Sequence, residues 1–181
     1  MESLMKRYLL FSDTHGKTGN LEWVLRTEDP FYGLCFCGDG EGLENILRNL
    51  PGCPPVIHMV AGNNDWYSAL PEDAVFPLGC HRVLMNHGHR FGIRRGLSVL
   101  GQYARLKECD LCFFGHSHRP CEEVCEGVLC VNPGSLSEPR QDPCLPSYMV
   151  ITVTDDGETE FELKYVNPQR GLSFPRQSPE S

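Results

Sequence analysis

The first third of the chain alternates between short apolar runs and segments in which apolar residues recur at helical spacing. The apolar runs, which are typical of buried strands, are residues 7–12, 34–37 and 55–60. Helical spacing marks residues 20–26 and residues 43–50, and the second of these segments stops at Pro51 and Gly52. This pattern predicts three strands joined by two helices.

In the rest of the chain, the pattern predicts mainly β-hairpins. Strand-like segments flank turn residues three times, pairing residues 74–78 with 81–85, 124–126 with 128–132, and 148–153 with 159–166. A helix over residues 97–107 and a buried strand over residues 111–114 interrupt them. Because β-α-β units give way to hairpins, we expect a layered α/β fold with two mixed sheets in a single domain, residues 1–166. The remaining residues, 167–181, are rich in Pro, Ser, Gln and Arg and are expected to be poorly ordered.

Side chains that bind metals follow five of the predicted strands. They are Asp13, His15, Asp39, Asn63, His87, His116 and His118. Ligands of α/β proteins gather outside the carboxyl ends of strands, so we expect these side chains to converge. Carboxylate and imidazole donors together suit Mn, Fe, Co, Ni or Zn, and the set predicts a dinuclear hydrolytic site. His116 and His118 are one residue apart on a turn, so each can reach a different metal.

Each of these segments also has an interpretation without chemistry. Asp13 could cap a helix, Asp39 between two glycines could form a turn, and Asn63 could form another. His87 and His89 could lie on an exposed loop. The metal site is favoured because all of these segments coincide at strand ends within one short chain.

Charge and hydropathy limit the binding partners and the cellular compartment that we expect for this protein. The formal charge of −8 argues against binding of a long nucleic acid, because such proteins contact phosphates with Lys and Arg. The apolar stretch near the N-terminus, residues 8–11, is too short for the core of a signal peptide or for a membrane span. We therefore expect a cytoplasmic protein without membrane contact.

The ten cysteines allow a competing zinc site. Cys109-x-x-Cys112 and Cys121-x-x-x-Cys125 could supply four thiolate ligands. Against this, Cys112 lies inside an apolar strand, and the turn with the two histidines separates the pairs. Reduced thiols that fill the core are the favoured interpretation.

Six polar motifs follow one another along the chain: Asp13-x-His15, Gly38-Asp39, Gly62-Asn63-x-Asp65, His87-Gly88-His89, Gly115-His116-Ser117-His118 and Asn132-Pro133-Gly134-Ser135. This ordered set resembles the motifs of the calcineurin-like metallophosphoesterases, and most closely those of the small bacterial and archaeal phosphodiesterases of that superfamily. The resemblance spans residues 7–166 and implies a four-layer α/β/β/α sandwich.

The resemblance also implies a ligand set and a reaction. Asp13, His15 and His118 would hold the first metal, and Asn63, His87 and His116 the second. Asp39 would bridge two divalent ions, with Mn expected first and Ni, Fe, Co, Zn or Mg as alternatives. A hydroxide shared by the metals would attack the phosphorus of a small phosphodiester in line.

One position departs from many relatives, which place a histidine after the ligand asparagine to protonate the leaving group. Here that residue is Asn64, so diesters with good leaving groups are expected to be favoured. His89 could replace the missing acid or contact the phosphate, and Asp65 is expected to support the loop. The alternative function is a non-catalytic, protein-binding scaffold of the same fold, and assembly into a homo-oligomer stays open.

Overall fold

Two five-stranded sheets form the centre of the protein, as seen in a computed structural model that describes residues 5–49 and 54–166. The first sheet has the order β10-β9-β1-β2-β3, with β1 (Lys6–Phe11), β2 (Gly33–Phe36), β3 (Val56–Met59), β9 (Ser147–Val153) and β10 (Thr159–Tyr165). The second has the order β4-β5-β6-β8-β7, with β4 (Asp73–Leu78), β5 (His81–Asn86), β6 (Leu111–Phe113), β7 (Pro120–Cys125) and β8 (Val128–Pro133). The expected end of the second helix at Pro51 and the expected disorder of residues 167–181 lie outside the described residues.

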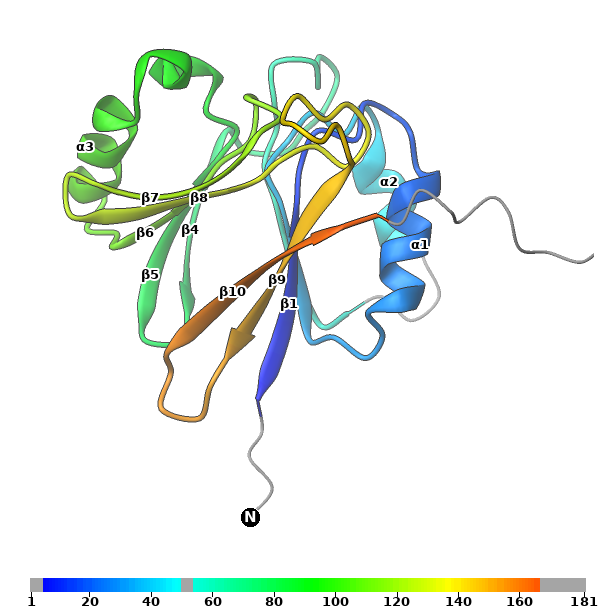
Figure 1. The fold of residues 1–181 in the computed structure, drawn as a ribbon, viewed down its shortest axis with the longest axis horizontal. Coiled ribbons are helices and arrows are strands. Elements are labelled where there is room, and N and C mark those ends of the chain that lie inside the picture. The colour runs from blue at the N-terminus through cyan, green and yellow to red at the C-terminus, as the bar shows by residue number, and fades with distance from the viewer. Residues whose placement is uncertain (1–4, 50–53, 167–181) are drawn as a thin grey trace, which may run out of the picture.

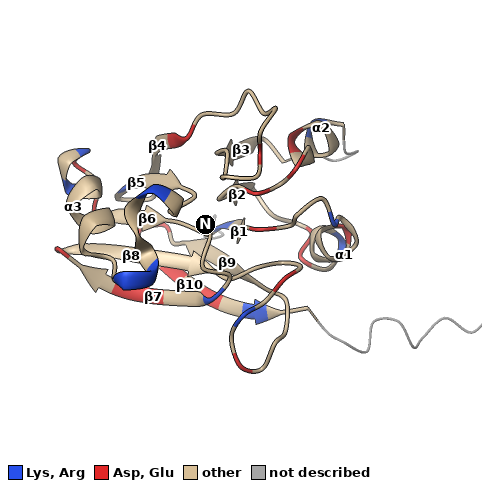
Figure 2. Ribbon diagram, turned by 90° about the horizontal axis from the view of Figure 1, so that it is seen from above, with Lys and Arg blue, Asp and Glu red and all other residues tan. Residues whose placement is uncertain are grey.

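Helices cover the outer face of each sheet. Helices α1 (Gly19–Thr27) and α2 (Leu43–Arg48) cover the first sheet, and α3 (Ser98–Leu106) covers the second (Figures 1 and 2). Side chains of a strand alternate between its two faces, so β1 turns Leu9 and Phe11 toward α1 and α2 and turns Leu10 toward the second sheet. A separate apolar cluster joins the second sheet to α3. These layers confirm the predicted α/β/β/α sandwich.

The strands bring their carboxyl ends to one end of the sandwich. Strands β1, β2 and β3 run parallel, and so do β5, β6 and β8 in the other sheet. In Figure 1 the loops that follow these strands meet at the top of the molecule. The predicted metal ligands lie on these loops.

One strand and two short 3-10 turns differ from the sequence prediction. Strand β7 begins at Pro120 rather than at residue 124, because an edge strand tolerates a first residue without an N–H group. Two 3-10 turns, η1 (His89–Phe91) and η2 (Ile93–Arg95), follow β5, where glycines interrupt any apolar periodicity. Among the described residues, every helix is too short or too polar to cross a membrane.

Candidate metal centre

The backbone of the strand-end loops is held in an unusual conformation at five of the predicted ligands. These residues have positive φ angles: Asp13 (56°), His15 (47°), Asp39 (57°), His116 (64°) and His118 (59°). For residues other than glycine, this conformation costs about 1 kcal/mol or more and persists only where surrounding contacts enforce it. Such strain gathers at functional sites.

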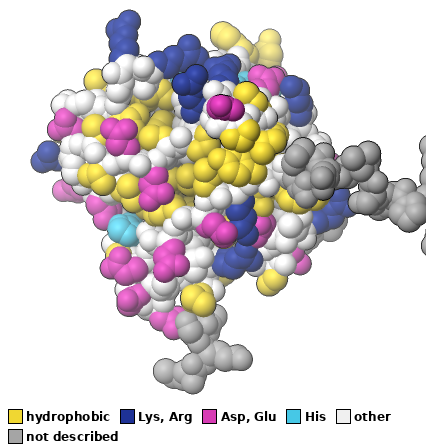
Figure 3. All heavy atoms as spheres, in the orientation of Figure 1, with side chains coloured by type: hydrophobic (Ala, Val, Ile, Leu, Met, Phe, Trp, Pro, Cys, Tyr) yellow, Lys and Arg dark blue, Asp and Glu magenta, His cyan; other side chains and the backbone are white. Residues whose placement is uncertain are grey.

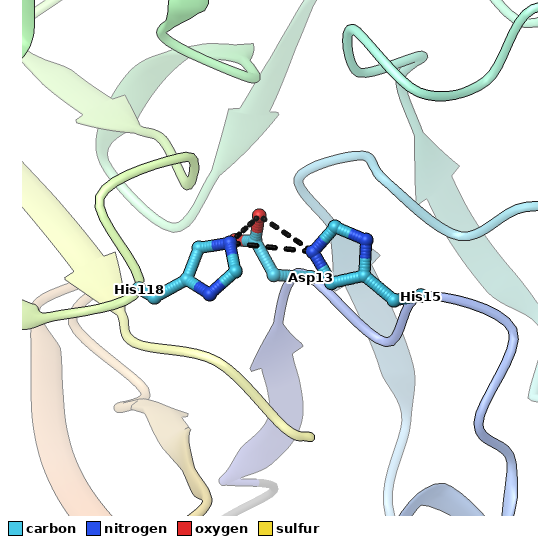
Figure 4. A group of neighbouring side chains, drawn as sticks. All are labelled: Asp13, His15 and His118. Carbon is cyan, nitrogen blue, oxygen red and sulfur yellow. Dashed lines mark hydrogen bonds and ion pairs between the residues drawn. The ribbon is translucent and has the colours of Figure 1, made fainter. Parts of the chain in front are cut away.

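Asp13, His15 and His118 form the first cluster of donor atoms (Figure 4). Oδ1 of Asp13 lies 3.2 Å from Nε2 of His118 and 3.9 Å from Nε2 of His15. The two Nε2 atoms lie 3.3 Å apart. This cluster joins the loop after β1 to the loop after β6, and therefore the two sheets.

In three of the histidines, Nδ1 faces away from the other donor atoms and contacts a backbone carbonyl or a carboxylate. Nδ1 of His118 donates to the carbonyl of Glu138 over 2.7 Å, and Nδ1 of His87 donates to the carbonyl of Cys37 over 2.7 Å. Nδ1 of His15 lies 2.9 Å from Oε1 of Glu41. A carbonyl acceptor requires the proton on Nδ1, so in the neutral ring Nε2 presents a lone pair to the centre.

Asp13 also belongs to a second cluster, with Asp39 and His87. Nε2 of His87 lies 3.3 Å from Oδ2 of Asp39 and 3.9 Å from Oδ1 of Asp13. Burial opposes ionisation of Asp39, but His87 and hydrogen bonds from Asn64 outweigh it and lower its pKa far below the ordinary value. Burial likewise disfavours protonated His87, yet the Asp39 and Asp13 carboxylates outweigh it and raise its pKa.

These clusters fit a metal site. Oδ1 of Asp13 and Nε2 of His87 are buried, and neither has a hydrogen-bond partner within the described part of the chain. A buried polar atom without a partner is costly. A divalent cation would satisfy both atoms and would separate the facing Nε2 atoms of His15 and His118. Carboxylate and imidazole donors suit a transition metal of this charge.

His116 and His89 lie beside the second cluster. The His116 ring is 5.2 Å from the His87 ring, and its backbone N–H donates to Oδ2 of Asp13. Burial and the nearby charges of His87 and Arg94 lower the pKa of His116 to about 4. The His89 ring lies 5.5 Å from that of His87, and burial together with His87 and Arg90 lowers its pKa. Both rings are therefore neutral near pH 7.

The two asparagines after β3 are placed differently from each other. The Asn64 side chain donates to Oδ2 of Asp39 over 2.7 Å, and its backbone N–H donates to Oδ1 over 2.8 Å. Asn63 is exposed, and no hydrogen bond between described residues links its side chain to the donor clusters. The assignment of Asn63 as a ligand stays a prediction. So does the bridging role of Asp39, since the carboxylate common to both clusters is that of Asp13.

Asp65 supports the loops as expected. Its Oδ2 accepts the N–H groups of Asp39 and Gly62, each over 2.8 Å. Its Oδ1 accepts those of Gly40 and Glu41 over 3.0 and 2.7 Å. The backbone of Gly62 lies so close to Asp39 that a Cβ on Gly62 would be 2.1 Å from Oδ1 of Asp39. Asp65 therefore sets the position of Asp39.

Several contacts that support the centre were not predicted from the sequence. Glu41 contacts His15, and the carbonyl of Glu138 contacts His118. Asn132 donates to the carbonyl of Gly115 over 2.8 Å, and Ser135 donates to the carbonyl of Asp13 over 2.8 Å. The Asn-Pro-Gly-Ser motif signalled the last two residues, but not which loops they join.

The cysteines lie apart from this centre. The nine described cysteines are free. Cys109 and Cys112 are buried in the apolar cluster under α3, with Cys121 and Cys125 packed against it. Burial raises the pKa of the Cys121 thiol to about 11, which keeps it protonated. Within the described residues, these four cysteines are not among the clusters of converging donor atoms.

The fold and donor clusters together define an α/β sandwich protein with a candidate metal site between two sheets. Residues 6–156 match the family model described as the calcineurin-like phosphoesterase superfamily domain. The chain therefore belongs to the calcineurin-like phosphoesterase superfamily.

Individual relatives agree with this family. Over 154 residues the chain is 34% identical to "Probable metallophosphoesterase YsnB" of Bacillus subtilis strain 168, covering 83% of this chain and 86% of that protein. The crystal structure of a predicted phosphoesterase from Streptococcus pneumoniae TIGR4 aligns with a TM-score of 0.72 and 28% identity, covering 91% of this chain and 94% of that one. Vps29 of Entamoeba histolytica complexed with Zn²⁺ aligns with a TM-score of 0.65 and 22% identity, covering 89% and 99%, and shares the fold.

Proposed function

We propose that this protein hydrolyses small phosphodiesters with the help of two divalent metal ions, Mn²⁺ first among them. The observation that carries the proposal is the pair of donor clusters sharing Asp13, with buried polar atoms that have no hydrogen-bond partner among the described residues. The family supports phosphoester hydrolysis. The number of metals and the preference for diesters are parts of the proposal.

The donors divide between two positions. Asp13, His15 and His118 would hold one ion, and His87 with His116 and Asn63 the other, with Asp39 between them. Bound ions of this kind activate water at neutral pH and neutralise charge on the phosphoryl group. The carbonyls of Cys37 and Glu138 keep Nε2 of His87 and His118 directed inward.

The preference for diesters with good leaving groups rests on Asn64. Its amide donates to Asp39, and an amide cannot supply a proton to a departing alkoxide. Neutral His89 can donate a hydrogen bond to a phosphoryl oxygen. A stable leaving group such as a phenolate needs no further proton.

The test is metal analysis of the purified protein with a screen of aryl and alkyl diesters and monoesters in Mn²⁺, Ni²⁺ and Mg²⁺. We expect two ions per chain and turnover of aryl diesters. Asp39→Asn should lose at least one ion and roughly 100-fold or more in kcat/KM, because Asp39 lies within both the donor set and the loop contacts. Asp155→Asn, on an exposed hairpin turn, is the matched control.

A protein that binds no metal and turns over none of these esters would instead fit the scaffold alternative. Full activity with two ions in Asp39→Asn would show that the site lies elsewhere.

A further inference from the structure

A pocket of about 740 Å³ next to the metal centre is lined by four arginines. They are Arg94, Arg95, Arg119 and Arg140. They come from η2 and from the loops after β6 and β8, so tertiary structure alone brings them together. Glu123 is the one acidic residue in the lining, so positive charge predominates there although the chain has a formal charge of −8.

Ion pairs between described residues leave these four arginines free. Between described residues, Arg7 pairs with Glu28, and Arg90 pairs with Glu72 and Asp73. No such pair within the described ranges involves the four arginines of the pocket. All four are exposed. Their guanidinium groups are therefore available to an anion from solution.

The pocket adjoins the loop that carries His116 and His118. Ser117, between His116 and His118, lines it, and Arg94 and Arg95 also line a neighbouring pocket of about 460 Å³ with His89 and His116. The backbone N–H of Arg140 donates to the carbonyl of His118 over 3.0 Å. Figure 3 shows Lys and Arg side chains gathered along the top of the molecule, the end at which the strand-end loops meet in Figure 1.

We propose that this arginine pocket binds a second phosphate group of the substrate, a terminal monoester carried near the diester that is cleaved at the metal centre. This rests on the proposed function and adds a substrate class to it, namely phosphodiesters that also bear a phosphomonoester. Arginine suits this role because its planar group binds phosphate oxygens in pairs. Ile93, Leu97 and Phe114 in the lining provide apolar contact for the organic part of such a molecule.

The test compares two esters that share the scissile diester and the leaving group. The first is the p-nitrophenyl ester of thymidine 5′-phosphate, and the second is the same ester with a 3′-phosphate. With Mn²⁺-loaded protein, we expect a kcat/KM at least about tenfold higher for the doubly phosphorylated ester. Arg119→Gln and Arg140→Gln should each reduce that ratio about tenfold. Arg48→Gln, an exposed arginine on α2, should leave the ratio unchanged.

Calorimetry separates this proposal from the proposed function. Thymidine 3′,5′-bisphosphate should bind the metal-loaded protein more tightly than thymidine 5′-phosphate, and the two pocket variants should remove the difference while Arg48→Gln keeps it. If neither ester is hydrolysed but this binding pattern appears, the phosphodiesterase proposal fails and the arginine pocket stands. Equal kcat/KM for both esters, together with equal binding of both nucleotides, would overturn the pocket.

Discussion

At the scale of single residues, Asp65 shows how a side chain outside the donor clusters can control them. Asp65→Asn keeps the size of the side chain, but its NH₂ group would face two backbone donors that the carboxylate now satisfies. We expect a loss of about 2 kcal/mol in the free energy of unfolding and a 10–100-fold loss of metal affinity. Chemical denaturation and metal titration measure these effects.

The control for Asp65→Asn is Asp155→Asn, which changes an exposed carboxylate in a hairpin turn. Metal affinity equal to that of the control would contradict the supporting role of Asp65.

Asn64 gives a second prediction at this scale. In Asn64→His the imidazole can protonate a leaving oxygen that lies within about 3 Å. Because alkyl leaving groups are stronger bases than phenolates, turnover of alkyl diesters should rise more than turnover of aryl diesters. The measurement is kcat/KM against leaving-group pKa for a graded diester series. Parallel slopes for both metal-loaded proteins would show that residue 64 is not next to the leaving group.

At the scale of elements, Glu28 joins helix α1 to three strands. This buried carboxylate follows α1 and accepts hydrogen bonds from Tyr148 over 2.7 Å and Lys164 over 3.0 Å, and it also pairs with Arg7. Burial opposes ionisation, but these partners outweigh it and lower the pKa of Glu28 below its ordinary value of 4.5. The stabilisation from this lowered pKa is therefore present above about pH 4.5 and is lost as the pH falls through the folded-state pKa.

Glu28→Gln should therefore lower the free energy of unfolding at pH 7 by about 1–2 kcal/mol, a modest value because Arg7 and Lys164 are partly exposed. The difference from wild type should shrink as the pH falls below 4, as measured by urea denaturation across pH. Glu162→Gln is the control, because Glu162 pairs with the same Lys164 while largely exposed. A difference that is constant with pH would rule out the charge as its cause.

At the scale of the whole molecule, the metal centre spans the two sheets. Asp13, His15 and Asp39 follow strands of the first sheet, while His87, His116 and His118 follow strands of the second. Since a ligand of the folded state stabilises it, Mn²⁺ at about 100 times its dissociation constant should add about 2.7 kcal/mol to the free energy of unfolding. Asp13→Asn should abolish this gain.

The thermal stability of metal-free Asp13→Asn provides an independent test. Asp13 is fully buried and its Oδ1 has no hydrogen-bond partner among the described residues, so removal of the charge should leave the metal-free Tm unchanged or higher. Thermal unfolding with and without Mn²⁺ in chelator-treated protein checks both points. A metal-induced rise in Tm that survives in Asp13→Asn would place the ion elsewhere.

The layers of the sandwich and the approximate bounds of most elements could be predicted from the sequence, because apolar runs and the helical spacing of apolar residues are local properties. Helix α3 illustrates this, since Leu97, Leu100 and Ala104 recur at helical spacing and all three are buried. The turns η1 and η2 could not be predicted from the sequence, because the apolar residues between Gly88 and Gly96 do not recur at a regular spacing. The start of β7 was missed because proline is an ambiguous signal in an edge strand.

By itself, the sequence determined the fold class and the kinds of donor atom at the strand ends, since polar residues directly after apolar runs mark those ends wherever the sheets lie. Tertiary structure alone decided which of these donors meet. It placed Asp13 in both clusters and Asn64 against Asp39, and it gathered four arginines from three loops beside the metal centre. Those contacts join residues far apart in the chain, so they depend on how the two sheets pack and how each loop is held, which no local pattern encodes.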